Sequence, residues 1–223
     1  MLEALEKVIA EQRLDATVLV VDDNSPDGTG ELADRLAGDA PRVRVLHRSR
    51  KEGLGPAYVA AFREALEGGA ELVLTIDCDF SHDPADVPRL IGAAAEADLV
   101  IGSRYVRGGG VRNWGLVRRA VSRGGCLYAQ VLLGAGIRDL TGGFKCYRRD
   151  VLEGIGLERI SSKGYAFQIE TTYRALRAGF RVIEVPIVFT DREVGRSKMS
   201  RGIVLEAIAR VPALRLRALR GRL

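Results

Sequence analysis

Short apolar runs alternate along the chain with segments whose apolar residues recur at helical spacing. The runs predict strands at residues 17–21, 43–46, 71–76, 99–101 and 182–188, and the helical patterns cover residues 28–36, 56–67, 86–95 and 115–133. Parallel neighbours need a crossover between them, so this order is typical of a mostly parallel, Rossmann-like α/β sheet flanked by helices. The runs at 17–21 and 71–76 lack polar alternation, which predicts strands buried on both faces.

The pattern extends over most of the chain without a linker, a low-complexity tract or a repeat. A length of 223 residues suits a single α/β domain, which at this size needs no disulfide to bury a core. We therefore expect one domain over residues 1–201. Residues 202–223 are expected to form a basic amphipathic helix that is part of this domain or appended to it.

The three cysteines, Cys78, Cys126 and Cys146, are widely spaced and include no CxxC pair. This spacing predicts neither a zinc site nor a disulfide framework, and it favours a reducing, cytoplasmic location. The sequence shows no leader-like N-terminus and no stretch of about 18 uncharged apolar residues. We therefore expect neither secretion nor a membrane span.

Basic charge is concentrated near the C-terminus. Residues 192–223 carry nine basic and two acidic side chains, against a net charge of +5 for the whole chain. Only 6% of the residues are aromatic, which argues against a nucleic-acid partner. Residues 203–214 are apolar at helical spacing but interrupted by Glu206 and Arg210. This pattern predicts a helix lying on an anionic membrane surface, with packing of the same face on the domain as the alternative.

Acidic residues follow two of the predicted strands, as Asp22 and Asp23 in VDDNSPDGT and as Asp77 and Asp79 in DCDFSHDP. Ligands of such sheets bind beyond the carboxyl ends of the strands. Two carboxylates separated by one residue can converge on a single Mg²⁺ or Mn²⁺ ion. Each cluster also has a plainer interpretation, as a hydrogen-bonded turn that precedes a helix.

Eight segments, in order and over nearly the whole chain, resemble one family. They are VVDDNSPDGT, GLGPAY, DCDFSHDP, GSRYVRGGGVRNW, RRAVSRG, DLTGGFKCYRR, KGYAFQIE and EVPIVFTDREVGRSK. The chain resembles the polyprenyl-phosphate mannose synthases, of dolichyl-phosphate and bacterial type, in glycosyltransferase family 2. The resemblance implies a GT-A fold and an inverting transfer of mannose from GDP-mannose to a polyprenyl phosphate. The expected location is peripheral, on the cytosolic face of a membrane.

The resemblance also implies roles for individual residues. Nucleotide-sugar contacts are implied for Val21, Asp23, Cys78, Asp79 and Arg104, and for Arg192 and Lys198 in a mobile basic loop that closes over the donor. Binding of Mg²⁺ or Mn²⁺ is implied for Asp77, Asp79 and Ser81, the last at a position where the family carries serine or glutamine. Contacts to the acceptor phosphate are implied for Arg104, Arg118 and Ser122, and these three with Asp79 are the implied catalytic residues. The implied partners are GDP-mannose, polyprenyl or dolichyl phosphate, an anionic membrane surface and small membrane proteins, with no nucleic acid.

The chemistry of such a transfer explains these residue types. The acceptor phosphate is already an anion near neutral pH, so it needs positioning rather than a strong general base. Arginine positions phosphate through its planar, bidentate guanidinium. Arg118 and Ser122 are four residues apart on a predicted helix and share a face. The plainer interpretation of Arg104 and Arg118 is solvated surface charge.

Five other polar or aromatic residues receive structural interpretations. His82 is expected to cap or solvate a turn, and Trp114 to pack as an apolar residue. Asp139 either orients the site or only holds a glycine-rich turn. Gln168 and Glu170 either support the basic loop or belong to a capped amphipathic helix.

Two functional alternatives remain open at this stage. The first is another donor sugar, for example glucose, because the sequence shows little of how an enzyme distinguishes sugars. The second is a truncated, inactive nucleotide-sugar-binding module. Relatives begin with an apolar, internal strand that has no counterpart before Leu2, so we expect a sheet without that strand and a true start upstream.

Overall fold

The computed structural model describes residues 1–162, 164–191, 201–221 and 223. In chain order the elements are α1 (Leu2–Glu11), β1 (Val18–Asp22), α2 (Thr29–Asp39), β2 (Val43–His47), α3 (Leu54–Glu67), β3 (Leu72–Thr75), η1 (Pro84–Asp86), α4 (Val87–Ala93), β4 (Leu99–Ser103), β5 (Gly110–Arg112), α5 (Leu116–Leu133), β6 (Lys145–Arg148), α6 (Arg149–Gly154), η2 (Leu157–Arg159), α7 (Ala166–Arg177), β7 (Val182–Pro186), β8 (Val188–Thr190) and α8 (Arg201–Leu219). All the predicted strands and helices are present. The short elements β5, β6 and α6 are additions, because three to six residues show no periodicity.

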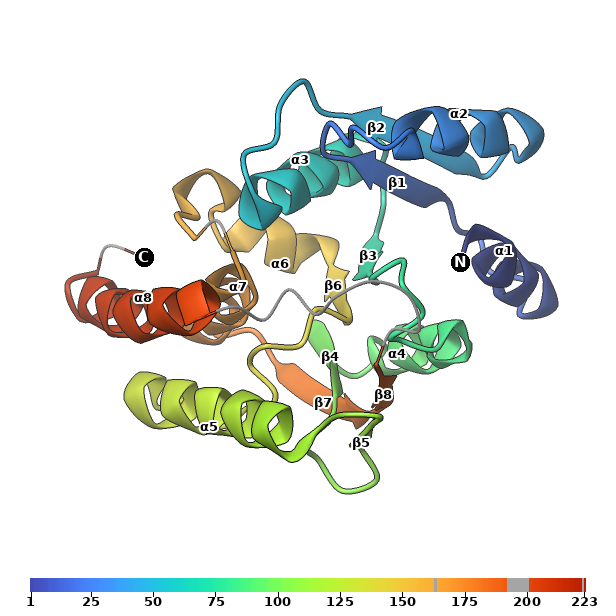
Figure 1. The fold of residues 1–223 in the computed structure, drawn as a ribbon. Coiled ribbons are helices and arrows are strands. Elements are labelled where there is room, and N and C mark those ends of the chain that lie inside the picture. Colours follow the sequence, from blue (N-terminus) through green and yellow to red (C-terminus); the bar gives the residue numbers. More distant parts are fainter. Residues whose placement is uncertain (163, 192–200, 222) are drawn as a thin grey trace.

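Four strands form a central sheet in the order β3-β6-β4-β7, which Figure 1 shows surrounded by helices. β4 and β7 are parallel, whereas β6 is antiparallel to both β3 and β4. The parallel pairs β1-β2 and β5-β8 form two further small sheets. The expected α/β class with mostly parallel pairing is therefore confirmed, and β6 is the antiparallel exception.

The strand β4 lies between two hydrophobic cores. Its fully buried Leu99 and Ile101 pack with side chains of α3, α5, α7 and α8, and Val100 packs on the other face with Leu90 of α4 and Leu5 of α1. Such alternation is expected of a strand covered on both faces. The sequence predicts burial on both faces for the runs at 17–21 and 71–76, which form β1 and β3. This prediction is wrong, since the residues of both strands are mostly half-buried. Each strand lies at the end of its sheet in the described part of the chain.

The predicted strand at 182–188 is divided between two sheets. The N–H of Ile187 donates to the Ser103 carbonyl at 3.0 Å, and the Ile187 carbonyl accepts from the N–H of Gly110, also at 3.0 Å. The chain therefore leaves β4 at this residue and pairs with β5. This transfer brings β8, and Asp191 after it, toward the loops that carry the predicted site residues.

The C-terminal helix α8 packs against α5 and α7, an arrangement visible in Figure 1. Its Val211, Leu214 and Ala218 are buried in the main core. Arg215 donates to the carbonyl of Leu133 at 3.2 Å, so its charge is also turned toward the domain. The prediction that this helix lies on a membrane surface is therefore wrong for Val211, Leu214 and Ala218. For these residues the alternative, packing of the apolar face on the domain, is correct.

Within the described residues the structure contains neither a disulfide nor a helix that could span a membrane. All three cysteines are free, as predicted, with Cys78 exposed and Cys126 and Cys146 buried. No helix within the described ranges combines the length and the apolar content that a membrane crossing requires.

Replacing Leu214 by alanine should destabilise the protein, because it opens a cavity between α8 and the main core. Leu214 is 2% exposed, and truncation of such a residue typically costs about 2–5 kcal/mol in the free energy of unfolding. Urea denaturation measures this quantity. Leu216→Ala is the matched control, since Leu216 lies on the same helix and is 53% exposed, and should change stability by less than about 0.5 kcal/mol. Equal effects of the two substitutions would contradict the packing of α8.

Candidate active site

Two loops leave the central sheet side by side at one edge. Lys145 of β6 pairs with Thr75 of β3 on one side and with Ile101 of β4 on the other. Because β3 and β4 are both antiparallel to β6, they run in the same direction and their carboxyl ends meet. Asp77 follows β3 and Arg104 follows β4. The structure therefore brings the predicted metal residues and the predicted phosphate residues to the same edge.

The loop after β3 presents carboxylates at the surface. The side chain of Asp77 is 48% exposed, and Asp79 accepts a hydrogen bond from the Ser81 N–H at 3.1 Å. Phe80, the residue after Asp79, adopts a φ of 57°. This is the left-handed region, which costs conformational free energy for a residue with a side chain. The carbonyl of Ser81 accepts from the N–H of Thr190 at 3.0 Å, which ties this loop to β8.

Asp77 and Asp79 fit a divalent metal site in which the substrate supplies some of the ligands. Among the described residues, no group of three histidine, cysteine or acidic side chains is arranged to hold a metal ion. Ser81 is 1% exposed, and its hydroxyl has no hydrogen-bond partner in the described part of the chain. Mg²⁺ typically uses one or two carboxylates and completes its octahedron with water and substrate phosphates. Asp77 and Asp79 therefore suit a cation shared with a diphosphate, rather than one held by protein alone.

His82 lies beneath the aspartates and is buried, not solvated. Its Nε2 is 3.7 Å from an Asp77 carboxylate oxygen, and its ring centroid lies 5.0 Å from each of the rings of Phe144 and Phe189. Burial lowers the pKa of His82 to about 4, and the nearby Arg104 charge acts in the same direction. The expectation of a turn-capping histidine is therefore wrong: His82 is a neutral member of the core, packed between two aromatic rings.

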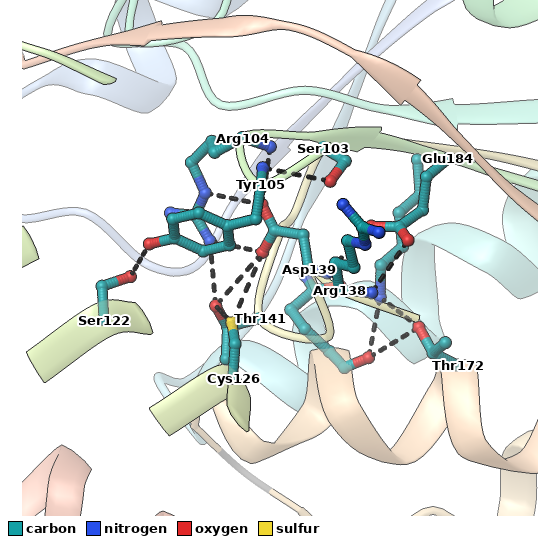
Figure 2. A network of polar contacts seen from close by, with 12 residues as sticks. Ser103, Arg104, Tyr105, Ser122, Cys126, Arg138, Asp139, Thr141, Thr172 and Glu184 are labelled. Atoms are coloured by element: carbon teal, nitrogen blue, oxygen red, sulfur yellow. Dashed lines mark hydrogen bonds and ion pairs between the residues drawn. The ribbon is translucent and has the colours of Figure 1, made fainter. Parts of the chain in front are cut away.

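Arg104 is anchored to Asp139, as Figure 2 shows. Asp139 accepts from Nε of Arg104 at 2.7 Å, from Nη2 at 2.6 Å and from the backbone N–H at 2.9 Å. Nη2 also donates to the Thr141 hydroxyl at 2.9 Å. The N–H of Asp139 in turn donates to Glu184 at 2.9 Å. Arg104 is thus a buried, paired residue, and Asp139 positions it as well as its turn.

The pair is largely protected from water. Asp139 is fully buried and the Arg104 side chain is 9% exposed. Burial alone would raise the pKa of Asp139, but the guanidinium of Arg104 keeps it below its usual range. The loop at 108–110 closes over the end of β4, and a Cβ on Gly109 would lie 2.5 Å from the Ser103 carbonyl oxygen. Only glycine permits this approach.

Arg118 and Arg104 both lie over the ring of Trp114. The Arg118 Cζ is 4.2 Å from the centroid of the Trp114 ring, and the Arg104 Cζ is 5.6 Å from it. Trp114 is 7% exposed and packs edge-on against Phe189, with ring centroids 5.3 Å apart. Nη1 of Arg118 donates to Asp191 at 2.5 Å. The predicted apolar packing of Trp114 is confirmed, and the tryptophan also contacts two cations.

The third predicted acceptor residue is held in the same cluster. Tyr105, next to Arg104, donates its hydroxyl to the Ser122 hydroxyl at 2.7 Å. Both Arg118 and Ser122 lie on α5 and are half-buried, so the shared face predicted from their spacing exists. Sequence reasoning did not assign Tyr105 or Phe189 to this site, because an aromatic residue carries no signal of its contacts.

The acids after β1 have separate roles. Asp22 is buried and accepts from the Ser25 N–H at 3.2 Å, which confirms the hydrogen-bonded turn for this residue. That contact with Ser25 lowers the pKa of Asp22 below its usual value. Asp23 forms an ion pair with Arg48 and its side chain is 23% exposed. Val21 lies within β1, paired with Leu46. Asp23 is therefore the acid that remains accessible at this strand end.

The remaining predicted residues lie elsewhere. Arg192 and Lys198 fall outside the described residues. Glu170 lies inside α7 and pairs with Arg174 at 3.0 Å, so it belongs to the helix interior. The Gln168 carbonyl accepts from Nζ of the fully buried Lys145 at 2.7 Å, and burial lowers the pKa of this lysine to about 7.

Comparisons with known proteins agree with this architecture. Residues 1–156 match the family model described as "Glycosyl transferase family 2". The chain is 50% identical over 213 residues to an undecaprenyl-phosphate mannosyltransferase of Micrococcus luteus, covering 94% of this chain and 88% of that protein. It is 53% identical over 196 residues to a polyprenol monophosphomannose synthase of Mycolicibacterium smegmatis, covering 87% and 74%.

Solved structures share the fold at low identity. A glucosyl-3-phosphoglycerate synthase of Mycobacterium tuberculosis matches with a TM-score of 0.60 and 20% identity, over 99% of this chain and 75% of that one. A mannosyltransferase of Pyrobaculum calidifontis, in complex with GDP-Man and Mn²⁺, matches with a TM-score of 0.52 and 16% identity, over 98% and 70%. These two likenesses establish a glycosyltransferase GT-A fold.

Asp139→Asn should destabilise the protein strongly, because it leaves the Arg104 guanidinium buried without a counter-charge. Breaking a buried ion pair by removing one partner costs about 3–5 kcal/mol, measured as the free energy of unfolding in urea. The control is Glu153→Gln, which removes a carboxylate from the exposed pair with Arg149 and should cost less than about 1 kcal/mol. A stability loss no larger than that of the control would show that Asp139 does not hold Arg104.

Proposed function

Because the chain belongs to glycosyltransferase family 2, we propose that it transfers mannose from GDP-mannose to a polyprenyl (dolichyl-type) monophosphate. The product is polyprenyl-phosphate mannose with an inverted anomeric carbon. The observation that carries this proposal is that the exposed Asp77 and the half-buried Asp79 after β3 lie at the same sheet edge as the Arg104, Arg118 and Ser122 cluster. Relatives that are 50–53% identical over most of their length bear the names of enzymes for this transfer.

The donor half of the site lies at the carboxyl ends of β1 and β3. Asp23 and the backbone of Val21 suit the nucleoside, and the exposed Cys78 stands between the two metal aspartates. A bound Mg²⁺ or Mn²⁺ ion, held by Asp77 and Asp79, would stabilise the negative charge that develops on the departing diphosphate. The resemblance adds Ser81 to these ligands and Arg192 and Lys198 to the donor contacts.

The acceptor half lies between β4 and α5. Arg118 and Ser122 suit the phosphate of the polyprenol, and Arg104 adds positive charge while Asp139 fixes its position. One phosphate oxygen attacks the anomeric carbon from the face opposite the diphosphate. A new carbon–oxygen bond forms as the bond to GDP breaks, and the electron pair leaves with GDP. The acceptor is already ionised, so its orientation replaces a general base.

The helix that carries the acceptor residues exposes an apolar outer face. Leu116 is 82%, Val117 79%, Leu127 59% and Val131 73% exposed. Apolar side chains gathered on one helix face mark an interaction surface. The acceptor is a lipid, so we assign this face of α5 to an anionic membrane surface, in place of the described part of α8. The resemblance to the family adds to this proposal that the binding is peripheral, on the cytosolic side, with small membrane proteins as further partners.

Asp79→Ala should abolish transfer while the protein stays folded, because Asp79 lies in a surface loop rather than in the core. The measurement is radiolabelled mannose transfer from GDP-mannose to a short polyprenyl phosphate with Mg²⁺ or Mn²⁺, and we expect a loss of about 100-fold or more. Circular dichroism checks the fold. Asp83→Ala, an exposed acid in the same loop, should keep most of the activity. Full activity of Asp79→Ala, or preference for another nucleotide sugar in the same assay, would refute the proposal.

Replacing Val117 and Val131 by glutamine should weaken membrane binding without harming chemistry. Burial of one such side chain contributes about 1.5 kcal/mol, so the loss of both corresponds to about 3 kcal/mol. The affinity for phosphatidylglycerol vesicles, measured by co-sedimentation, should fall about 100-fold. Transfer to a detergent-solubilised acceptor should remain. Leu32→Gln on α2, where the leucine is 48% exposed, is the control. If the double variant sediments like the wild type, α5 does not dock on the membrane.

A further inference from the structure

The carboxylate of Asp191 already binds Arg118, the residue that is predicted to bind the acceptor phosphate. Nη1 of Arg118 donates to Oδ2 of Asp191 at 2.5 Å, and the two side chains are 19% and 28% exposed. The guanidinium also lies over the ring of Trp114, with Cζ 4.2 Å from its centroid. Arg118 is thus held by an aromatic face and by an acid.

The backbone around Asp191 is fixed by the small sheet. The N–H of Asp191 donates to the Arg112 carbonyl at 3.1 Å, and the N–H of the preceding Thr190 donates to the Ser81 carbonyl at 3.0 Å. Thr190 also pairs with Arg112 in the β5-β8 ladder. The carboxylate therefore reaches Arg118 from an ordered strand end that also contacts the loop of the metal aspartates.

The guanidinium of Arg118 has hydrogen-bonding capacity left over. Its Nε is buried and has no hydrogen-bond partner among the described residues. An arginine fork binds a tetrahedral phosphate through two parallel N–H groups. A phosphate monoester carries more negative charge and more acceptor oxygens than the carboxylate of Asp191. It can therefore replace this carboxylate as the partner of Arg118.

We propose that Asp191 is an internal competitor of the acceptor phosphate, which holds Arg118 in place while the site is empty and yields it when a phosphate monoester arrives. This inference rests on the proposed function and adds a positioning residue to it. An acceptor phosphate that binds Nη1 must displace Asp191 from it, so the apparent affinity equals the intrinsic affinity reduced by the fraction of Arg118 whose Nη1 is available. Asp191 therefore sets the acceptor concentration at which the enzyme works.

The test uses Asp191→Asn in the full chain. Its KM for farnesyl phosphate should fall about two- to fivefold, the factor that corresponds to a partly exposed ion pair, with kcat little changed. Asp191→Glu, which keeps a carboxylate, should bind more like the wild type. Glu64→Gln is the matched control for charge, because Glu64 pairs with Arg44 at the same 2.5 Å and is 31% exposed. Its KM should stay that of the wild type.

A second readout needs no turnover. Trp114 is the single tryptophan of the chain, and it stacks on Arg118, so its fluorescence reports occupancy at this arginine. Titration with farnesyl phosphate, and separately with inorganic phosphate, should give tighter binding in Asp191→Asn than in the wild type. In the background of Arg118→Ala, the Asp191→Asn substitution should have no further effect on either ligand.

The outcomes separate this inference from the proposed function. A KM that is unchanged or raised in Asp191→Asn, with wild-type transfer intact, would overturn the competitor role. A raised KM would instead show that Asp191 orients Arg118 for phosphate. An equal fall of KM in Glu64→Gln would show that the effect comes from net charge alone, and it would also overturn the competitor role. Absence of mannose transfer by the wild type would refute the proposed function itself, whatever the fluorescence shows.

Discussion

The buried ion pair of Arg104 and Asp139 is the contact on which the rest of the site depends. Asp139 accepts hydrogen bonds from the side chain and the backbone of Arg104, so it fixes the end of β4 in space. Its other neighbours include Cys126 of α5, whose Sγ lies 3.7 Å from Oδ1. Burial makes an unpaired charge costly here, so the two residues stay together and align α5 with the central sheet.

A row of rings connects the two halves of the site. His82 lies beside Asp77 and against Phe189, Phe189 packs on Trp114, and Trp114 supports Arg118. Close-packed side chains of this kind transmit position because they leave little free volume. Asp77, which we propose for the donor side, and Arg118, which we propose for the acceptor side, are therefore connected by one packed framework. A reaction between two anionic substrates requires such fixed positions, since their charges repel.

Helix α5 has two faces of different character. Its inner face carries Arg118 and Ser122, and its outer face exposes Val117 and Val131. A polyprenyl phosphate has the same division, with a charged head and an apolar chain. Under the proposed function, one helix would present the head to the reaction centre while its apolar face rests on the lipid that holds the chain.

The sequence by itself determined the α/β class, the positions of most strands and the residue types of the site. Apolar runs mark strands wherever the chain is long enough to show a period, and Asp77, Asp79, Arg104 and Arg118 stand in motifs that resemble one family. It did not determine the direction of β6, the division at Ile187, the burial of His82 or the packing of α8. A hydrophobic pattern shows which face of a segment is apolar, but not what covers it. The partners of Arg104 and Arg118 are 35 and 73 residues away in the chain, so only the tertiary structure, which brings those distant residues together, decided how the two arginines are held.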